Sequence, residues 1–223
     1  MGFAFFDLDD TLVDTQAALH TWSLDFVAEY GLGDGDDEQA AAQVVTHRAH
    51  DVVTWRDFAE KAREWYGIDT PADVLFEELA TTYVRKFTLS PVVADGLTRL
   101  HDAGWQLGIV TNGMTRVQHG KIDQVGLREY VDAVIDSQAA GFSKPDRRIF
   151  ELAAGKLGVE LGPEGWMVGD MLDKDVAGGI AAGLRTIWLP YEATRSDGDP
   201  RPEFTVASIG AAIAIVEGAA RSE

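Results

Sequence analysis

The sequence predicts a doubly wound α/β fold with one helical segment inserted into it. Five short apolar runs alternate with helix-like stretches along most of the 223 residues. Continuous apolar runs of this length are typical of parallel strands that are covered on both faces. Prolines near the starts of the intervening stretches, and glycines after their ends, are typical helix boundaries. A parallel sheet with helices on both faces follows from this alternation.

The predicted strands and helices follow one another in regular order. Strands are expected at 3–6, 106–111, 130–135, 165–169 and 185–189. Helices are expected between them at 91–103, 114–125, 147–157 and 176–182. Pro91 and Pro145 each stand at the expected start of a helix. A closing strand at 204–207 and a helix at 209–217 complete the prediction.

The segment 15–88 breaks the alternation because it contains no convincing strand. Its apolar residues recur with helical spacing. The expected helices are 17–30, 38–53, 55–66 and 71–87. Thr70 is expected to cap the last helix, with Pro71 as its first residue. We therefore predict two domains, a main one of residues 1–14 and 89–223 and a smaller helical one of residues 15–88.

Composition excludes several classes of function. The chain has no cysteine, which excludes disulfides, thiolate metal sites and cysteine nucleophiles. Its formal charge of −18 disfavours binding to a nucleic acid polymer or to an anionic membrane. No apolar stretch is long enough to span a bilayer, and the first residues do not resemble a signal peptide. We expect a cytoplasmic protein; the acidic excess fits either a salt-rich habitat or a genome bias.

Carboxylates follow two of the predicted strands. Asp7 and Asp9 come directly after the first strand, and Asp170 comes directly after the fourth. Ligands bind at the carboxyl ends of strands in sheets of this kind. Several carboxylates in one pocket repel one another and require a cation, and oxygen ligands without sulfur favour Mg²⁺. The alternative interpretation is a polar turn after the first strand and a solvated acidic loop after the fourth.

Groups suited to a phosphoryl ligand follow the other strands. Thr111, Asn112 and Gly113 end the second strand, and Lys144 precedes the helix after the third. A hydroxyl, a backbone amide and an ammonium group are the donors that a phosphoryl group needs. Each signal is weak alone, because such a turn is common and a lysine before proline usually lies at the surface.

Taken together in this order, the motifs resemble those of the haloacid dehalogenase superfamily, and the resemblance covers essentially the whole chain. The four motifs are DLDDTL at 7–12, VTNG with Thr111, SKPD with Lys144, and GDMLDKD at 169–175. The resemblance implies a Rossmann-like sheet of strand order 5-4-1-2-3, which brings Asp7, Asp170 and Thr111 side by side. It also implies that residues 15–88 are the helical C1 cap of subfamily I, in the phosphatase branch.

The resemblance further implies a role for each acidic residue. Asp7 is the expected nucleophile, which attacks phosphorus and forms an aspartyl-phosphate. Asp9 is the expected acid and base, which protonates the leaving oxygen and then activates water. Mg²⁺ is expected on the Asp7 carboxylate, the Asp9 carbonyl and Asp170, with Asp175 supporting this shell.

Thr111, the Asn112 amide and Lys144 are expected to hold the phosphoryl oxygens, again by resemblance. The fourth motif usually carries asparagine where this chain has Lys174. This departure affects no expected metal ligand.

The predicted function is a Mg²⁺-dependent phosphatase acting on a small phosphorylated metabolite through an aspartyl-phosphate. A nucleoside monophosphate or a sugar phosphate is the expected substrate, and phosphoglycolate is the alternative. The sequence also leaves open a 2-haloacid dehalogenase, a phosphosugar mutase and a non-catalytic binding protein with this fold. It does not identify the substrate or the residues that contact it, and both a monomer and a homodimer stay open.

Overall fold

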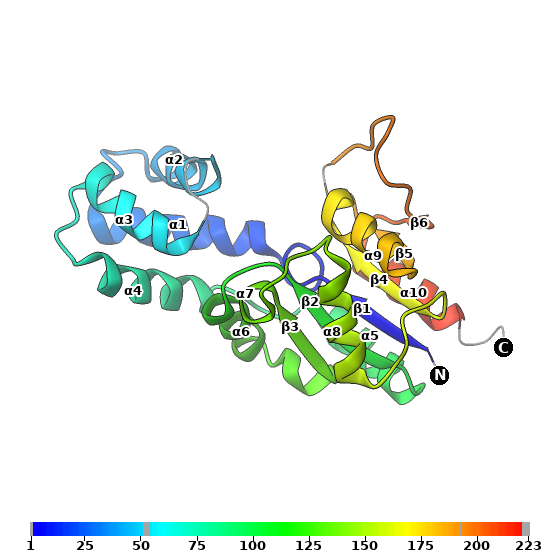
Figure 1. The fold of residues 1–223 in the computed structure, drawn as a ribbon. Coiled ribbons are helices and arrows are strands. Elements are labelled where there is room, and N and C mark those ends of the chain that lie inside the picture. Colours follow the sequence, from blue (N-terminus) through cyan, green and yellow to red (C-terminus); the bar gives the residue numbers. More distant parts are fainter. Residues whose placement is uncertain (1, 51–53, 192, 220–223) are drawn as a thin grey trace. The chain divides into compact units, whose positions relative to one another are not determined.

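The computed structural model describes residues 2–50, 54–191 and 193–219, and the chain divides into two compact units. The first unit consists of Met1–Val13 and Thr88–Glu223, and the second is Asp14–Phe87. The second unit is therefore an insertion between the first strand and the rest of the sheet (Figure 1).

A six-stranded parallel sheet forms the centre of the first unit, in the order β3-β2-β1-β4-β5-β6. The strands are β1 (Phe3–Phe6), β2 (Gln106–Thr111), β3 (Ala133–Asp136), β4 (Gly165–Gly169), β5 (Arg185–Trp188) and β6 (Phe204–Thr205). The order read from β5 to β3 is the one expected, and β6 extends it at one edge. Phe6 at the end of β1 lies opposite Ile109 and Val168. The segments that follow β1, β2 and β4 thus all leave the sheet on the same side, at the carboxyl ends of the strands. This side is called the sheet edge below.

Helices contact the sheet in two packed pairs. One pair is α5 (Pro91–Asp102) with α10 (Ile209–Ala219), and the other is α8 (Arg147–Leu157) with α9 (Ala177–Ala182). Phe3, Phe5 and Phe150 belong to one core of fully buried side chains with apolar residues of α8. Such burial stabilises by about 25 cal/mol per Å² of apolar surface removed from water. The doubly wound α/β prediction is confirmed.

The predicted start of the third strand is wrong. The strand expected at 130–135 begins only at Ala133, because Leu127–Tyr130 forms a short 3-10 helix after Gly126. The helix expected at 147–157 forms as α8, although Pro145 is not its first residue. Asp146 caps it by accepting a hydrogen bond of 3.0 Å from the Arg148 amide, so proline precedes the cap. The helix α6 (Thr115–Gln124) forms as expected, shortened by one residue at each end.

The second unit contains four helices within its described residues. They are α1 (Thr15–Tyr30), α2 (Asp37–His50), α3 (Trp55–Tyr66) and α4 (Ala72–Val84). The expected extension of the second helix to residue 53 lies outside the described residues. Pro71 occupies the N-cap position of α4 and makes no side-chain cap, so the predicted Thr70 cap is wrong. The helix also ends three residues before the predicted end at 87.

Aromatic rings fill the core of the second unit. The Trp22 ring lies edge-on to Trp55, with centroids 4.9 Å apart, and also contacts Phe26 and Phe58. Its indole N–H donates to the Thr82 hydroxyl at 3.1 Å. Large rings with a satisfied polar atom give a well-packed core, which holds the four helices together. Among the described residues, no helix has the length and apolar character that crossing a membrane requires.

Candidate active site

The nucleophile position expected from the sequence lies at the end of the central strand. The Asp7 amide still donates to the Val168 carbonyl at 2.9 Å, so β4 fixes the backbone of Asp7. The chain then turns tightly, because the amides of Leu12 and Val13 both donate to the Leu8 carbonyl. Asp10 occupies the left-handed region in this turn, with φ of 54°, a conformation that aspartate adopts more readily than most residues.

Asp170 and Asp175 come from the segment that follows β4. A one-turn π-helix at Leu172–Val176 brings Asp175 back toward the end of the strand. A Cβ atom at residue 169 would lie 2.3 Å from Asp175 Cγ, so glycine at this position makes room for the carboxylate. The Asp175 carboxylate in turn accepts from the Met171 amide at 3.0 Å. The segment is thereby folded tightly against the tip of β4.

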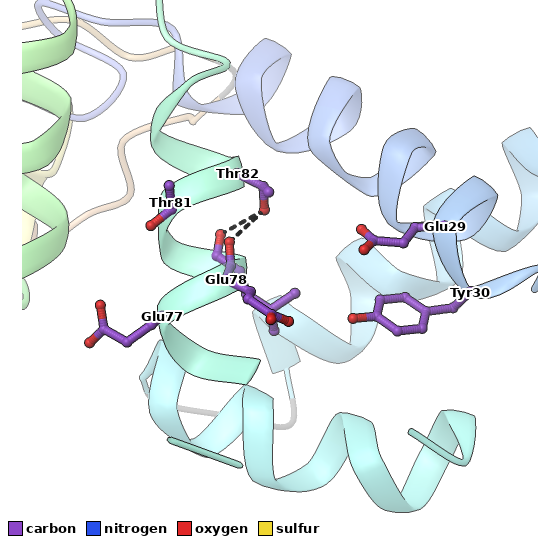
Figure 2. Close-up of a pocket in the computed structure, with 7 residues that line it drawn as sticks. Glu29, Tyr30, Glu77, Glu78, Thr81 and Thr82 are labelled. Carbon is purple, nitrogen blue, oxygen red and sulfur yellow. Dashed lines mark hydrogen bonds between the residues drawn. The ribbon is translucent and has the colours of Figure 1, made fainter. Parts of the chain in front are cut away.

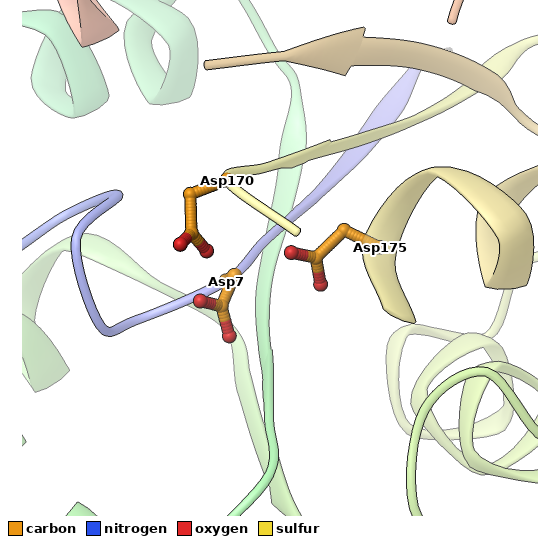
Figure 3. A group of neighbouring side chains, drawn as sticks. All are labelled: Asp7, Asp170 and Asp175. Carbon is orange, nitrogen blue, oxygen red and sulfur yellow. The ribbon is translucent and has the colours of Figure 1, made fainter. Parts of the chain in front are cut away.

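Asp7, Asp170 and Asp175 converge at this edge of the sheet. Their carboxylates lie close together (Figure 3), and one oxygen of each lies within 4.8 Å of the others. Asp7 and Asp175 are buried, whereas Asp170 is partly exposed. The topology explains the meeting, because β1 and β4 are adjacent parallel strands.

Lys144 lies among these carboxylates. Its ammonium group contacts Asp7 Oδ1 at 2.5 Å and Asp175 Oδ1 at 2.7 Å, and its side chain is 2% exposed. Burial lowers the pKa of Lys144, but Asp175 and Asp7 outweigh this and raise it above its ordinary value. Burial raises the pKa of Asp7 well above its ordinary value, and Asp175 and Asp9 add to this against the opposing effect of Lys144.

The charge in this cluster is not balanced by the lysine. Burial, together with the carboxylates of Asp175 and Asp10, raises the pKa of Asp170 to about 7. Three converging carboxylates face one ammonium group, which leaves excess negative charge in a partly buried site. A divalent cation with a preference for oxygen ligands would neutralise this charge. The donor set therefore fits a Mg²⁺ ion.

Thr111 and Asn112 extend the site from the end of β2. Thr111 is 1% exposed, and its hydroxyl accepts from the Gln118 amide at 2.6 Å. The Asn112 side chain holds the backbone of Lys144, since the Lys144 amide donates to Asn112 Oδ1 at 2.8 Å and the Lys144 carbonyl accepts from Nδ2 at 3.1 Å. The sequence predicted a role for the Asn112 backbone amide and missed this side-chain clamp.

Two residues of α6 that sequence reasoning missed contact the Asp9 carboxylate. Lys121 Nζ lies 2.6 Å from Asp9 Oδ1, and Gln118 Nε2 donates to Asp9 Oδ2 at 2.8 Å. Both α6 side chains are buried. Polar residues three apart share a helix face, and this spacing directly after the Thr111 motif was the available signal.

The second unit has a hollow of its own between α1 and α4, with a volume of about 370 Å³. Glu29 and Tyr30 line it from α1, and Glu77 and Glu78 line it from α4 (Figure 2). Three carboxylates in one hollow would repel a phosphate group. We therefore take the cluster at the sheet edge as the candidate active site.

Comparison with known proteins finds a matching family, similar sequences and similar structures. Residues 3–183 match the haloacid dehalogenase-like hydrolases. The pyrimidine 5'-nucleotidase YjjG of Escherichia coli K12 is 28% identical over 210 residues, which cover 92% of this chain and 93% of that protein. The glyceraldehyde 3-phosphate phosphatase of Methanothermobacter thermautotrophicus is 29% identical, covering 87% and 88%. The crystal structure of a 2-haloacid dehalogenase from Pseudomonas syringae superimposes with a TM-score of 0.70 and 25% identity, covering both chains fully.

Proposed function

Because the chain belongs to the haloacid dehalogenase-like hydrolases, we propose that it hydrolyses a small phosphate monoester through a covalent intermediate on Asp7. Phosphatases of nucleotides and sugar phosphates among its relatives support this class of reaction. The observation that carries the proposal is the buried Asp7 carboxylate, which lies at the strand end within an ion pair to Lys144 and beside Asp170.

The proposed reaction has two steps. An Asp7 oxygen attacks phosphorus, the bond from phosphorus to the ester oxygen breaks, and Asp9 gives its proton to the leaving alcohol. In the second step a water oxygen attacks phosphorus, Asp9 takes a proton from that water, and the bond between phosphorus and Asp7 breaks. Inorganic phosphate leaves, and Asp7 and Asp9 return to their initial states.

Lys144 and Thr111 support both steps in this proposal. Lys144 keeps Asp7 in position and places positive charge beside the oxygens of the transferred group. The Thr111 hydroxyl and the Asn112 amide donate to the same oxygens. Because Asn112 also holds the Lys144 backbone, the two phosphate-binding segments are tied together.

Asp7, Asp170 and the Asp9 carbonyl would hold Mg²⁺, with Asp175 supporting this arrangement. When bound, the ion neutralises negative charge on the phosphoryl group and on the nucleophile. Asp175 fixes the Lys144 ammonium and the Met171 amide, so it stabilises the shape of the site around the ion.

The test is release of phosphate from 4-nitrophenyl phosphate with Mg²⁺ and with EDTA. We expect turnover only with the metal, and a covalent phosphate on the protein that is absent from Asp7→Asn. Turnover that persists in Asp7→Asn at more than about a hundredth of the wild-type rate would exclude this nucleophile, because removing one costs about 10⁴-fold or more.

We also propose the class of substrate and the role of the second unit. A nucleoside monophosphate or a sugar phosphate is the proposed substrate, with residues 15–88 acting as the cap domain for the core of residues 1–14 and 89–223. Cytoplasmic location and a monomeric or homodimeric state complete the proposal. A screen of phosphorylated metabolites ranked by kcat/KM tests the substrate class, and light scattering tests the oligomeric state.

The second candidate function is dehalogenation of a 2-haloacid, and the structural likeness to the Pseudomonas syringae dehalogenase favours it. In that reaction Asp7 would attack carbon and displace halide. Halide release from 2-chloropropionate without metal, together with no phosphate release from any ester, would establish this function in place of the phosphatase.

A further inference from the structure

The Asp9 carboxylate is held from the side by α6. Lys121 Nζ contacts one of its oxygens at 2.6 Å, and Gln118 Nε2 contacts the other at 2.8 Å. The Lys121 side chain is only 5% exposed, whereas the Asp9 side chain is 29% exposed. A carboxylate that remains accessible to substrate is thus held by two donors that lie deeper in the unit.

Burial of Lys121 argues against an ordinary surface ion pair. Removing an ammonium group from water costs several kcal/mol unless a close partner compensates, and exposed lysine pairs contribute about 0–1 kcal/mol. The Asp9 carboxylate is the close partner that compensates for burial of the Lys121 ammonium group.

Gln118 links Asp9 to the position expected to bind phosphate. The same amide nitrogen that donates to Asp9 also lies 2.6 Å from Thr111 Oγ1. A Cβ atom at residue 113 would lie 2.8 Å from Gln118 Cδ, so glycine at this position leaves room for the side chain. One side chain thereby sets the spacing between the Asp9 carboxylate and the Thr111 hydroxyl.

We propose that Lys121 and Gln118 are positioning residues that hold the Asp9 carboxylate for its work on the phospho-enzyme, an inference that rests on the proposed function. One donor on each carboxyl oxygen fixes the orientation of the group that takes a proton from water in the second step. Loss of Lys121 then slows hydrolysis of the Asp7–phosphate bond more than its formation.

The experiment uses 2,4-dinitrophenyl phosphate, whose leaving group needs no acid. Lys121→Met is compared with Lys156→Met, the same change at an exposed lysine of α8. We expect Lys121→Met to release dinitrophenol in a rapid burst equal to the enzyme concentration, followed by turnover about 10–100-fold slower than wild type. Radiolabelled phosphate should accumulate on the protein, whereas Lys156→Met should behave as wild type does.

A double variant separates positioning from general damage. If Lys121 acts through Asp9, Asp9→Asn with Lys121→Met should be no slower than Asp9→Asn alone, within about threefold. The inference is overturned if the losses of turnover in the two single variants add up in the double variant. It is also overturned if Lys121→Met turns over more slowly without accumulating phospho-enzyme, or turns over as fast as Lys156→Met. If Lys121→Met does not remain folded at the assay temperature, Gln118→Leu is measured against the same criteria.

The outcomes also distinguish this inference from the proposed function. If wild type forms no phospho-enzyme and releases no phosphate with Mg²⁺, the phosphatase proposal fails. If wild type turns over and Lys121→Met does so equally well, only the role of Lys121 fails.

Discussion

The two units of the chain bury different kinds of side chain. Among the described residues, all the buried charged side chains lie in the first unit: Asp7, Lys121, Asp136, Lys144 and Asp175. The second unit instead buries aromatic rings around Trp22, and Ser23 is the polar residue that it buries within its described part. Buried charges cost stability, whereas buried rings contribute to it. Substitutions in the first unit should therefore separate activity from stability, and those in the second should not.

The largest expected effect is that of Asp7→Asn. Turnover should fall by about 10⁴-fold or more, because no other group takes the place of a nucleophile. Stability should not fall, because burial and neighbouring carboxylates already make the Asp7 charge unfavourable, and Lys144 still pairs with Asp175. Urea unfolding, measured beside the assay, checks both parts. A loss of stability above about 1 kcal/mol would contradict the contrast between the units.

Trp22→Ala, in contrast to Asp7→Asn, should reduce the stability of the protein. Removing this buried ring should lower the free energy of unfolding by about 3–5 kcal/mol. Trp65→Ala, at a ring that is 36% exposed, is the matched control and should cost much less. Chemical denaturation of both variants gives the comparison. Equal losses would show that the aromatic core does not determine the stability of the second unit.

Asp170→Asn should weaken Mg²⁺ binding by about 10–100-fold, because the ion loses a charged ligand. Calorimetric titration with Mg²⁺ measures the change directly. Asp173→Asn is the control, since Asp173 lies three residues further along the same segment with its side chain 65% exposed and paired with Lys174. An unchanged Mg²⁺ affinity in Asp170→Asn would show that the metal does not bind at this cluster.

The smallest expected effect is on the pH dependence of stability in EDTA. The pKa of Asp170 is raised from 3.8 to about 7, so the folded protein binds this proton more tightly than the unfolded chain does. The resulting stabilisation is complete below about pH 4 and is lost as the pH rises through about 7. Between about pH 4 and pH 7, the free energy of unfolding of wild type should therefore fall by about 1–2 kcal/mol relative to that of Asp170→Asn. This value is reduced because Asp170 is partly exposed. If the free energies of unfolding of the two proteins differ by a constant amount between about pH 4 and pH 8, the raised pKa of Asp170 is contradicted.

Much of the fold could be predicted because short apolar runs alternate regularly with helix-like stretches bounded by proline and glycine. The order of the sheet followed from the family resemblance, and the structure confirms it. The predicted third strand begins at Tyr130, inside the 3-10 helix, because short apolar runs do not distinguish strand from helix. Helix α8 spans the predicted residues 147–157, but Asp146, and not the proline before it, caps the helix.

The part of the candidate site that lies on a helix was harder to predict from the sequence, because the prediction requires knowing which face of the helix is directed toward the site. Strand ends are recognisable in the sequence, so Asp7 and Asp170 could be named from it. Lys121 and Gln118 lie within a helix, and the sequence does not say which face of α6 turns toward the sheet edge. Only the three-dimensional structure places their donors on the Asp9 carboxylate.

The insertion of the second unit after β1 has a consequence for biosynthesis. Phe3–Phe6 leaves the ribosome well before its sheet partners Gln106 and Gly165, whereas Asp14–Phe87 is a contiguous stretch that precedes both of them. Contiguous units fold as they emerge, and pairing of distant strands comes later. The apolar strand beside Asp7 must therefore stay unpaired while the helical unit is already assembling. The centre of the sheet is among the first parts made and among the last completed.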